Sequence, residues 1–398
     1  MGQNLGKMPQ VALLFETNEQ AHREILKGVL RYESVHGPWS LHVIEGRTGE
    51  QRLLSMKTWG GSGLVGVIQN RAYAAAIAAA RVPAVLIDPI DAAFLPPGLL
   101  ERHSVLASDQ VAIGELAAEY FLSRGFKHFA FVGEVNNINW SRDRGAAFAA
   151  RVRQAGYDCR TYGPLRPREK RDWLLERGRL WIWLAGLSKP AAVFAAMDTR
   201  GRQVLDACLV AGLMVPHEVA VLAVDNDTLI CESTTPPLAS IALDTERMGY
   251  EAAKLLDGAM RRRKVRRHQW VFPPLAVVPR RSAETVRISD PLVARALEFI
   301  WLNAQNPIGV PEIVAHANVS RRLLEIRFRK TLKVSIREEL SRARLHRVKN
   351  LLSATNLSVT VIAKDCGFSS KSYLGKVFRR AFGVTATAYR TAYWQTPR

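Results

Sequence analysis

Short apolar runs alternate with segments of helical periodicity over the first two-thirds of the chain. The series opens with an apolar run at 11–15, an amphipathic segment at 20–32 and a second apolar run at 41–44. Such alternation is typical of βαβ units, which build parallel sheets. Further strands are expected at 63–68, 84–87, 129–132, 191–196 and 219–224, with helices such as 112–124 and 145–155 between them. These units are too many for one small sheet and predict two doubly wound lobes.

The alternation stops near residue 281. Prolines 273, 274 and 279 cluster just before the polar stretch 282–290, and beyond it the sequence shows only short amphipathic helices joined by tight turns. We therefore expect an α/β domain at 1–283, a linker at 284–290 and an all-α domain at 291–398.

A repeat of about 50 residues lies within this last segment. The turn Asn-Val-Ser at 318–320 recurs as Gly-Phe-Ser at 367–369. Asn and Gly tolerate a left-handed turn, and Ser is a favoured helix N-cap. An apolar pair at i, i+4 follows each turn: Leu324 with Phe328, and Leu374 with Phe378. The pattern predicts two helix-turn-helix units in tandem.

The face of each second helix that lies opposite the apolar pair carries side chains able to read DNA bases. Arg and Lys can donate to guanine, and Glu can accept from cytosine. The candidates for base reading are Arg321, Arg322, Glu325, Lys371, Ser372 and Lys376. Other basic residues are assigned to phosphates, which position a protein without reading sequence: Arg329, Arg337, Arg344, Arg379, Arg380 and Arg390. For a single helix, a solvated basic face would be the simpler interpretation.

Charge favours the DNA interpretation. The chain has 56 Lys and Arg against 36 Asp and Glu, a formal charge of +20. From Ser289 to Arg398 we count 19 basic and 7 acidic residues, so this segment carries +12 of the excess. A basic segment that also holds a repeated helix-turn-helix pattern predicts binding to double-stranded DNA.

Polar side chains recur at the ends of the predicted strands of the α/β domain. Ligands of open α/β sheets bind beyond the carboxyl ends of the strands, and carboxylates and amides suit vicinal hydroxyls. An aromatic ring can stack on a sugar, and a guanidinium can donate a fork of hydrogen bonds. Each residue alone could instead be a helix cap or turn former, but together they predict a sugar site: Glu16, Asn18, Gln69, Asn70, Asp88, Trp140, Arg144, Asp198, Asp225 and Asn226.

The C-terminal segment resembles the DNA-binding domain of AraC-type regulators. The resemblance runs over about 100 residues and includes 319–328, Gly-Phe-Ser-Ser at 367–370, Phe382-Gly383 and Tyr389-Arg390. It implies that two helix-turn-helix units enter successive major grooves on one face of the DNA.

The larger segment resembles the ligand-binding domain of LacI/GalR-type regulators, which is similar to periplasmic sugar-binding proteins. Asp198, Asp225-Asn226 and Arg144 match that family's motifs. This order of the two domains is typical of the family of xylose operon regulators. The resemblance implies a homodimeric activator that closes on D-xylose, repositions its DNA modules at operator half-sites and acts on RNA polymerase.

Other function classes find little support. No catalytic motif and no metal-binding His or Cys spacing is present, so neither an enzyme nor a cofactor is expected. The scattered cysteines are expected to be reduced thiols in the cytoplasm, and the sequence shows neither a signal segment nor a membrane span. A sugar transport component or sugar enzyme with a basic tail, and a sequence-independent DNA-packaging protein, stay as alternatives.

Overall fold

The computed structural model describes residues 8–44, 59–68, 70–136, 138–163, 173–261, 267–284, 290–304, 306–355 and 357–395. The chain divides into two compact units, Met1–Thr285 and Val286–Arg398. Most of the predicted linker, 285–289, falls outside the described residues. Within the described part of the chain, no helix is both long enough and apolar enough to cross a membrane.

The first lobe of unit 1 is built on a parallel sheet with the strand order β11-β5-β4-β3-β1-β2. Its strands are β1 (Gln10–Leu14), β2 (Ser40–Ile44), β3 (Gly63–Val67), β4 (Ala84–Ile87), β5 (Ser104–Ser108) and β11 (Gln269–Phe272). Its helices are α1 (Gln20–His36), α3 (Arg71–Ala80), α4 (Leu99–Arg102), the 3-10 turn η2 (Ala92–Phe94) and α11 (Thr245–Arg261). Apolar side chains of α1 and α11 pack on one face of the sheet and those of α3 on the other.

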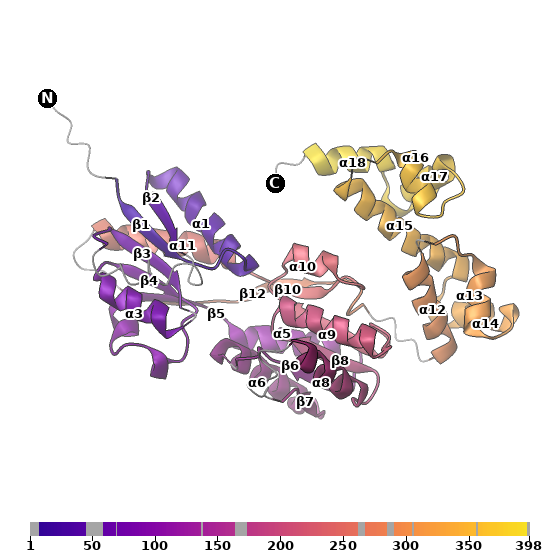
Figure 1. Cartoon of the computed structure of the whole chain (residues 1–398), viewed down its shortest axis with the longest axis horizontal. Coiled ribbons are helices and arrows are strands. Elements are labelled where there is room, and N and C mark those ends of the chain that lie inside the picture. The colour runs from indigo at the N-terminus through magenta and orange to yellow at the C-terminus, as the bar shows by residue number, and fades with distance from the viewer. Residues whose placement is uncertain are drawn as a thin grey trace. The chain divides into compact units, whose positions relative to one another are not determined.

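The second lobe has the strand order β12-β10-β9-β8-β6-β7, with β12 antiparallel at its edge. Its strands are β6 (His128–Val132), β7 (Cys159–Thr161), β8 (Ala191–Ala195), β9 (Val219–Val224), β10 (Ala239–Leu243) and β12 (Pro274–Val278). Its helices are α5 (Gln110–Leu122), α6 (Asn139–Gln154), α8 (Trp173–Ala185), α9 (Asp198–Val210) and α10 (Thr228–Ser233). Helices α5 and α6 cover one face of the sheet, and α8 and α9 cover the other (Figure 1).

The chain crosses between the lobes three times, after β5, β10 and β11. This architecture confirms the predicted pair of doubly wound lobes. Five strands were not expected from the sequence: β5, β7, β10, β11 and β12. Strand β7 has only three residues, and Pro273 and Pro274 interrupt the apolar run that contains β11 and β12. These two prolines therefore lie where the chain passes from one lobe to the other.

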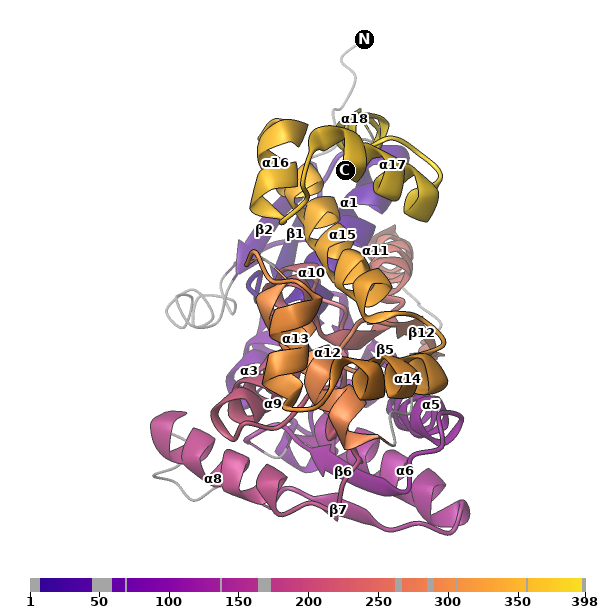
Figure 2. The ribbon, with the colours of Figure 1, turned by 90° about the vertical axis from the view of Figure 1, so that its right-hand side faces the viewer.

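Unit 2 is entirely helical among its described residues. Its helices are α12 (Pro291–Asn303), α13 (Val310–Ala317), α14 (Arg321–Leu332), α15 (Ile336–Ala354), α16 (Val359–Asp365), α17 (Lys371–Phe382) and α18 (Ala386–Gln395). Within this unit, α15 runs from the group α12–α14 to the group α16–α18 (Figure 2). The all-α prediction is confirmed.

The two predicted turns both have a left-handed residue, Asn318 at φ 53° and Gly367 at φ 70°. Ser320 caps α14 as predicted, with its side chain accepting from the amide of Leu323. In the second turn the cap is Ser370 instead of Ser369, because this turn is one residue longer.

Candidate functional site

Three carboxylates and one guanidinium meet between the lobes of unit 1. Asp88 follows β4 in the first lobe, whereas Asp198 begins α9 after β8 and Asp225 follows β9 in the second lobe. Arg144 reaches them from the second turn of α6 and is only 5% exposed. Carboxyl ends of parallel strands converge at one edge of a sheet, which explains why residues so distant in sequence gather here.

Arg144 is held by neutral partners as well as by charge. Its Nε donates to Oε1 of Gln110 at 2.6 Å, and its Nη1 donates to the carbonyl of Ala196 at 2.6 Å. The guanidinium lies over the ring of Trp140, 4.8 Å from the centroid. Burial lowers the pKa of Arg144, and the nearby carboxylates of Asp225, Asp88 and Asp198 oppose this shift. Arg144 therefore neutralises part of an acidic cluster.

Asp198 is the most enclosed of the three acids, with 1% of its surface exposed. Its carboxylate accepts from the amide of Asp227 at 2.6 Å and from the hydroxyl of Ser240 at 2.6 Å. Burial, together with the neighbouring charge of Asp225, raises the pKa of Asp198 to about 8. Two nearby carboxylates cannot easily be ionised together, so this site holds a proton near neutral pH.

Asp225 and Asn226 occupy a tight turn with positive φ values of 103° and 50°. Such values are uncommon outside glycine and persist where the surrounding structure imposes them. Burial raises the pKa of Asp225 to about 6, against the attraction of Arg144. The amide of Asn226 donates to Ser240 at 2.9 Å, and its side-chain oxygen accepts from Arg280 at 3.0 Å. Among the described residues, no group donates a hydrogen bond to the Asp225 carboxylate, which leaves it available to a ligand.

Asp88 completes the cluster from the first lobe. Its φ is 40°, and its carboxylate accepts from the amide of Ser108 at 2.8 Å and from the hydroxyl of Ser108 at 3.0 Å. Burial raises the pKa of Asp88, while these hydrogen bonds, Arg144 and His22 lower it. The two lobes thus contribute charges to one polar site.

Polar contacts also join the lobes around this site. They are the ion pair of Arg23 with Asp227 at 3.0 Å, the donation from Asn139 to the carbonyl of Pro89 at 3.0 Å, and the ion pair of Arg142 with Asp91 at 2.8 Å.

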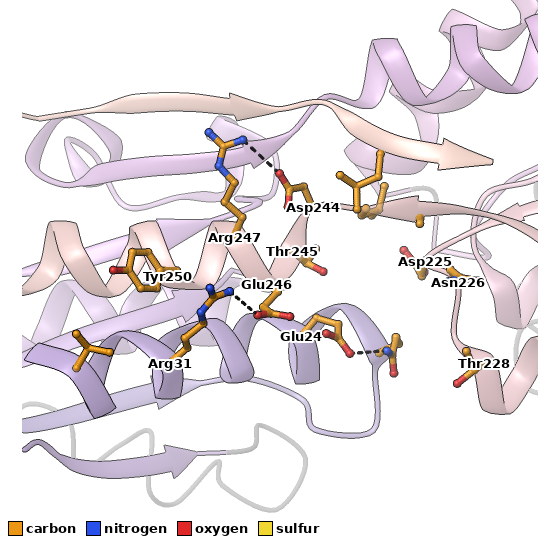
Figure 3. A pocket seen from close by; sticks show the side chains of 15 residues that line it. Glu24, Arg31, Asp225, Asn226, Thr228, Asp244, Thr245, Glu246, Arg247 and Tyr250 are labelled. Atoms are coloured by element: carbon orange, nitrogen blue, oxygen red, sulfur yellow. Dashed lines mark hydrogen bonds and ion pairs between the residues drawn. The ribbon is translucent and has the colours of Figure 1, made fainter. Parts of the chain in front are cut away.

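A hollow of about 790 Å³ opens beside the turn at Asp225 and Asn226 (Figure 3). The rest of its lining comes from α1, α11 and the end of β10, with Thr228 of α10 and Leu275 of β12. Two ion pairs lie along it, Arg31 with Glu246 and Arg247 with Asp244. Polar groups of both lobes are therefore accessible from this side.

The remaining predicted sugar contacts lie differently. Glu16 accepts from the hydroxyl of Tyr73 at 2.7 Å, and Asn70 caps α3 by accepting from the amide of Tyr73. Asn70 thus fills the helix-capping role that was the simpler interpretation. Asn18 is exposed in the turn before α1, and Gln69 lies outside the described residues.

Several residues that support the site were not expected from the sequence. His22 is buried close to Glu16 and Asp88. Gln110 accepts a hydrogen bond from Arg144. Ser240 forms hydrogen bonds with both Asp198 and Asn226. Ser240 lies on β10, a strand that the sequence did not reveal. Arg280, which donates a hydrogen bond to the side chain of Asn226, was not among the candidate site residues either.

The two helices α14 and α17 of unit 2 present the same surface. Leu324, Phe328, Leu374 and Phe378 are fully buried, and the pattern of exposure is identical over 321–330 and 371–380. The predicted base-reading side chains all belong to these two segments. All of them are exposed except Glu325, which is half-buried. Glu325 pairs with Arg321 at 2.9 Å. Each helix thus has one buried apolar face and one exposed face that carries basic side chains.

Among the basic residues assigned to phosphates, Arg329, Arg337, Arg379 and Arg380 are exposed. Arg344 and Arg390 differ, because the guanidinium of Arg344 donates to backbone carbonyls of the loop after α12, and that of Arg390 donates to carbonyls at the end of α15 and just beyond it. These hydrogen bonds favour a structural role for both residues over the predicted phosphate contact.

Comparison with known proteins identifies both units. Residues 118–283 match the periplasmic binding protein-like domain, and residues 313–392 match the helix-turn-helix domain. The helical part also resembles the HTH-type transcriptional regulator GbdR of Pseudomonas aeruginosa, at 33% identity over 24% of this chain and 26% of that protein. The chain is a transcriptional regulator whose second unit carries a helix-turn-helix DNA-binding domain.

Similarity to regulators of this kind extends over nearly the whole length of the chain. The xylose operon regulatory proteins of Haemophilus influenzae and Escherichia coli K12 are each 28% identical over 96% of this chain, covering 98% and 97% of their own lengths. The structure of the xylose-binding transcription activator xylR superposes with a TM-score of 0.82 at 27% identity, over 97% of this chain and 98% of that one. The CelR–cellobiose complex, at 22% identity and a TM-score of 0.57 over 69% of this regulator and 84% of that chain, shares the fold.

Proposed function

We propose that this regulator activates genes of D-xylose or other pentose utilisation when the sugar binds between the lobes of unit 1. The sugar hydroxyls would donate to the carboxylates of Asp88 and Asp225, and Trp140 would contact the sugar ring. Asp198, Arg144 and Asn226 set the charge and shape of the site. A ligand that binds one conformation more tightly shifts the population toward it. In this way sugar concentration would control DNA binding.

The observation that carries this proposal is the convergence of acids from both lobes on one buried arginine. Binding of neutral polyols requires several fixed acceptors and donors in a partly desolvated cleft. Xylose as the sugar is supported by the similarity to xylose regulators over almost the full chain. The chain would act by binding and not by catalysis.

The DNA-binding part of the proposal assigns residues 291–398 to operator recognition and 1–283 to sugar sensing. Helices α14 and α17 would read two neighbouring major grooves, with Lys371, Ser372 and Lys376 contacting bases from α17. Two copies would bind paired half-sites as a homodimer and contact RNA polymerase at the promoter. Because the partner is genomic DNA, the site of action would be the bacterial cytoplasm.

Calorimetric titration of the full chain with a panel of pentoses and hexoses tests the sugar assignment. We expect saturable binding of D-xylose, and loss of measurable binding in Asp225→Ala. Asn18→Ala is the matched control, since Asn18 was also a candidate but is exposed in the turn before α1. No saturable binding of any sugar, or equal binding by both variants, would contradict the proposal.

A further inference from the structure

The two helix-turn-helix units of the DNA-binding part have separate apolar cores. The first core ends on α15 at Ala343, and the second begins on the same helix at Leu345. No buried apolar residue is shared between these two cores among the described residues. The residue between them on α15 is Arg344.

The guanidinium of Arg344 binds the first helix-turn-helix unit. Its Nη2 donates to the carbonyl of Ile308 at 2.7 Å and lies 3.4 Å from the carbonyl of Asn306. Its Nε lies 3.4 Å from the carbonyl of Ala304. These carbonyls belong to the connection between α12 and α13, so Arg344 ties α15 to that loop.

The same guanidinium lies against the second helix-turn-helix unit. A Cβ atom built on Gly367 would lie 2.8 Å from both Cζ and Nη2 of Arg344 and 2.9 Å from Nε. The three nearly equal distances show that the flat face of the guanidinium covers this glycine. Gly367 forms the turn between α16 and α17, with φ 70°. One side chain thus contacts the loops of both units.

We propose that Arg344 is a positioning residue that fixes α17 relative to α14 and thereby sets the separation of the two DNA segments that these helices read. This inference rests on the proposed reading of DNA by both helices. A planar guanidinium can bond through its edge and pack through its face at once, which a lysine cannot do. Because the cores are separate, α15 and this junction carry the alignment.

The chain supplies two internal controls. Arg390 makes similar edge contacts, from Nε to the carbonyl of Leu352 at 3.3 Å and from Nη2 to that of Leu357 at 2.6 Å, but these stay within the second unit. Gly383 has a similar φ of 74°, and a Cβ built on it would meet nothing within 4 Å. Alanine at Gly383 therefore reproduces the backbone strain of alanine at Gly367 without the contact to Arg344.

The test uses the full chain and a DNA duplex that the wild type selects from a random pool. Footprinting locates the protected half-sites, and one base pair is then inserted or removed inside each half-site, between the segments assigned to α14 and α17. We expect the wild type to lose about tenfold in affinity, which corresponds to losing part of one set of base contacts. Arg344→Met and Gly367→Ala should bind the original duplex less tightly but lose less than about threefold on the altered duplexes.

Arg390→Met and Gly383→Ala should keep the wild-type sensitivity to spacing. The inference would be overturned if Arg344→Met still lost about tenfold in affinity on the altered duplexes. It would also be overturned if Arg344→Met and Arg390→Met responded equally to the change in spacing. If circular dichroism shows that Arg344→Met does not fold, the comparison of Gly367→Ala with Gly383→Ala decides the question. A wild type that is indifferent to spacing would contradict the proposed two-helix reading itself, a result visible without any variant.

Discussion

The inter-lobe site and the DNA-reading faces use charge in opposite ways. Between the lobes, Asp198 and Arg144 are 1% and 5% exposed, and the protonation of each acid depends on its neighbours. On α14, the side chain of Arg321 is 65% exposed and that of Glu325 is 44% exposed. Charges buried together determine the stability and conformation of a site, whereas solvated charges chiefly affect the encounter with a charged partner.

Removal of the buried cation should have the largest effect on stability. Arg144→Leu leaves Asp225 and Asp88 without the counter-charge that Arg144 supplies to the cluster. We expect the free energy of unfolding at pH 7 to fall by about 3–5 kcal/mol. Denaturant unfolding monitored by tryptophan fluorescence would measure it.

The loss should be smaller at pH 5, because burial raises the pKa of Asp225 to about 6 and this acid takes up a proton between pH 7 and pH 5. Arg142→Leu is the control, because Arg142 lies two residues away on the same helix and its ion pair with Asp91 is partly exposed. It should cost about 1 kcal/mol or less. Equal losses in the two variants would contradict the contrast between buried and solvated charges.

The pH dependence of stability should reveal the proton on Asp198. The folded-state pKa is about 8, far above the ordinary value near 3.9. Because the unfolded chain releases this proton at a lower pH, the group destabilises the fold increasingly as pH rises between these two values. Asp198→Asn removes that titration, so its free energy of unfolding should gain about 3–4 kcal/mol relative to wild type between pH 5 and pH 8.

Unfolding of both proteins at pH 5, 6.5 and 8 measures this difference. Asp225 titrates in both, so its contribution largely cancels in the comparison. Parallel stability curves for the two proteins would show that Asp198 is ionised throughout this range.

The solvated DNA face should show the smallest changes in stability and distinct changes in DNA binding. Glu325→Ala and Arg380→Ala should each alter the free energy of unfolding by less than about 0.5 kcal/mol. Glu325→Ala should change the preferred bases by about 1–3 kcal/mol at one position. Arg380→Ala should weaken binding to all DNA sequences. It should also reduce the slope of the logarithm of the binding constant against the logarithm of the salt concentration by about 1. Selection from random DNA and titrations at several salt concentrations distinguish the two, and identical effects would contradict the assigned roles.

Much of the fold could be predicted from local patterns. Seven strands and the whole repeat of the helical unit follow from apolar runs and from pairs at i, i+4. Strands β10, β11 and β12 were not predicted; they lie next to the places where the chain passes between lobes, and β11 pairs with β5, which is far earlier in the chain. Because β10 was not predicted, the hydrogen bonds of Ser240 with Asp198 and Asn226 could not be expected.

Features that depend on near neighbours in the chain follow from the amino-acid sequence: helix caps, left-handed turns, buried pairs such as Leu324 with Phe328, and the excess of positive charge. Which charged side chains contact one another became clear only from the folded structure. Arg23 binds Asp227 across 204 positions, and Arg344 contacts loops on both sides of α15. The physical reason is that side-chain periodicity is local, whereas burial and ion pairing depend on segments that folding brings together from distant parts of the chain.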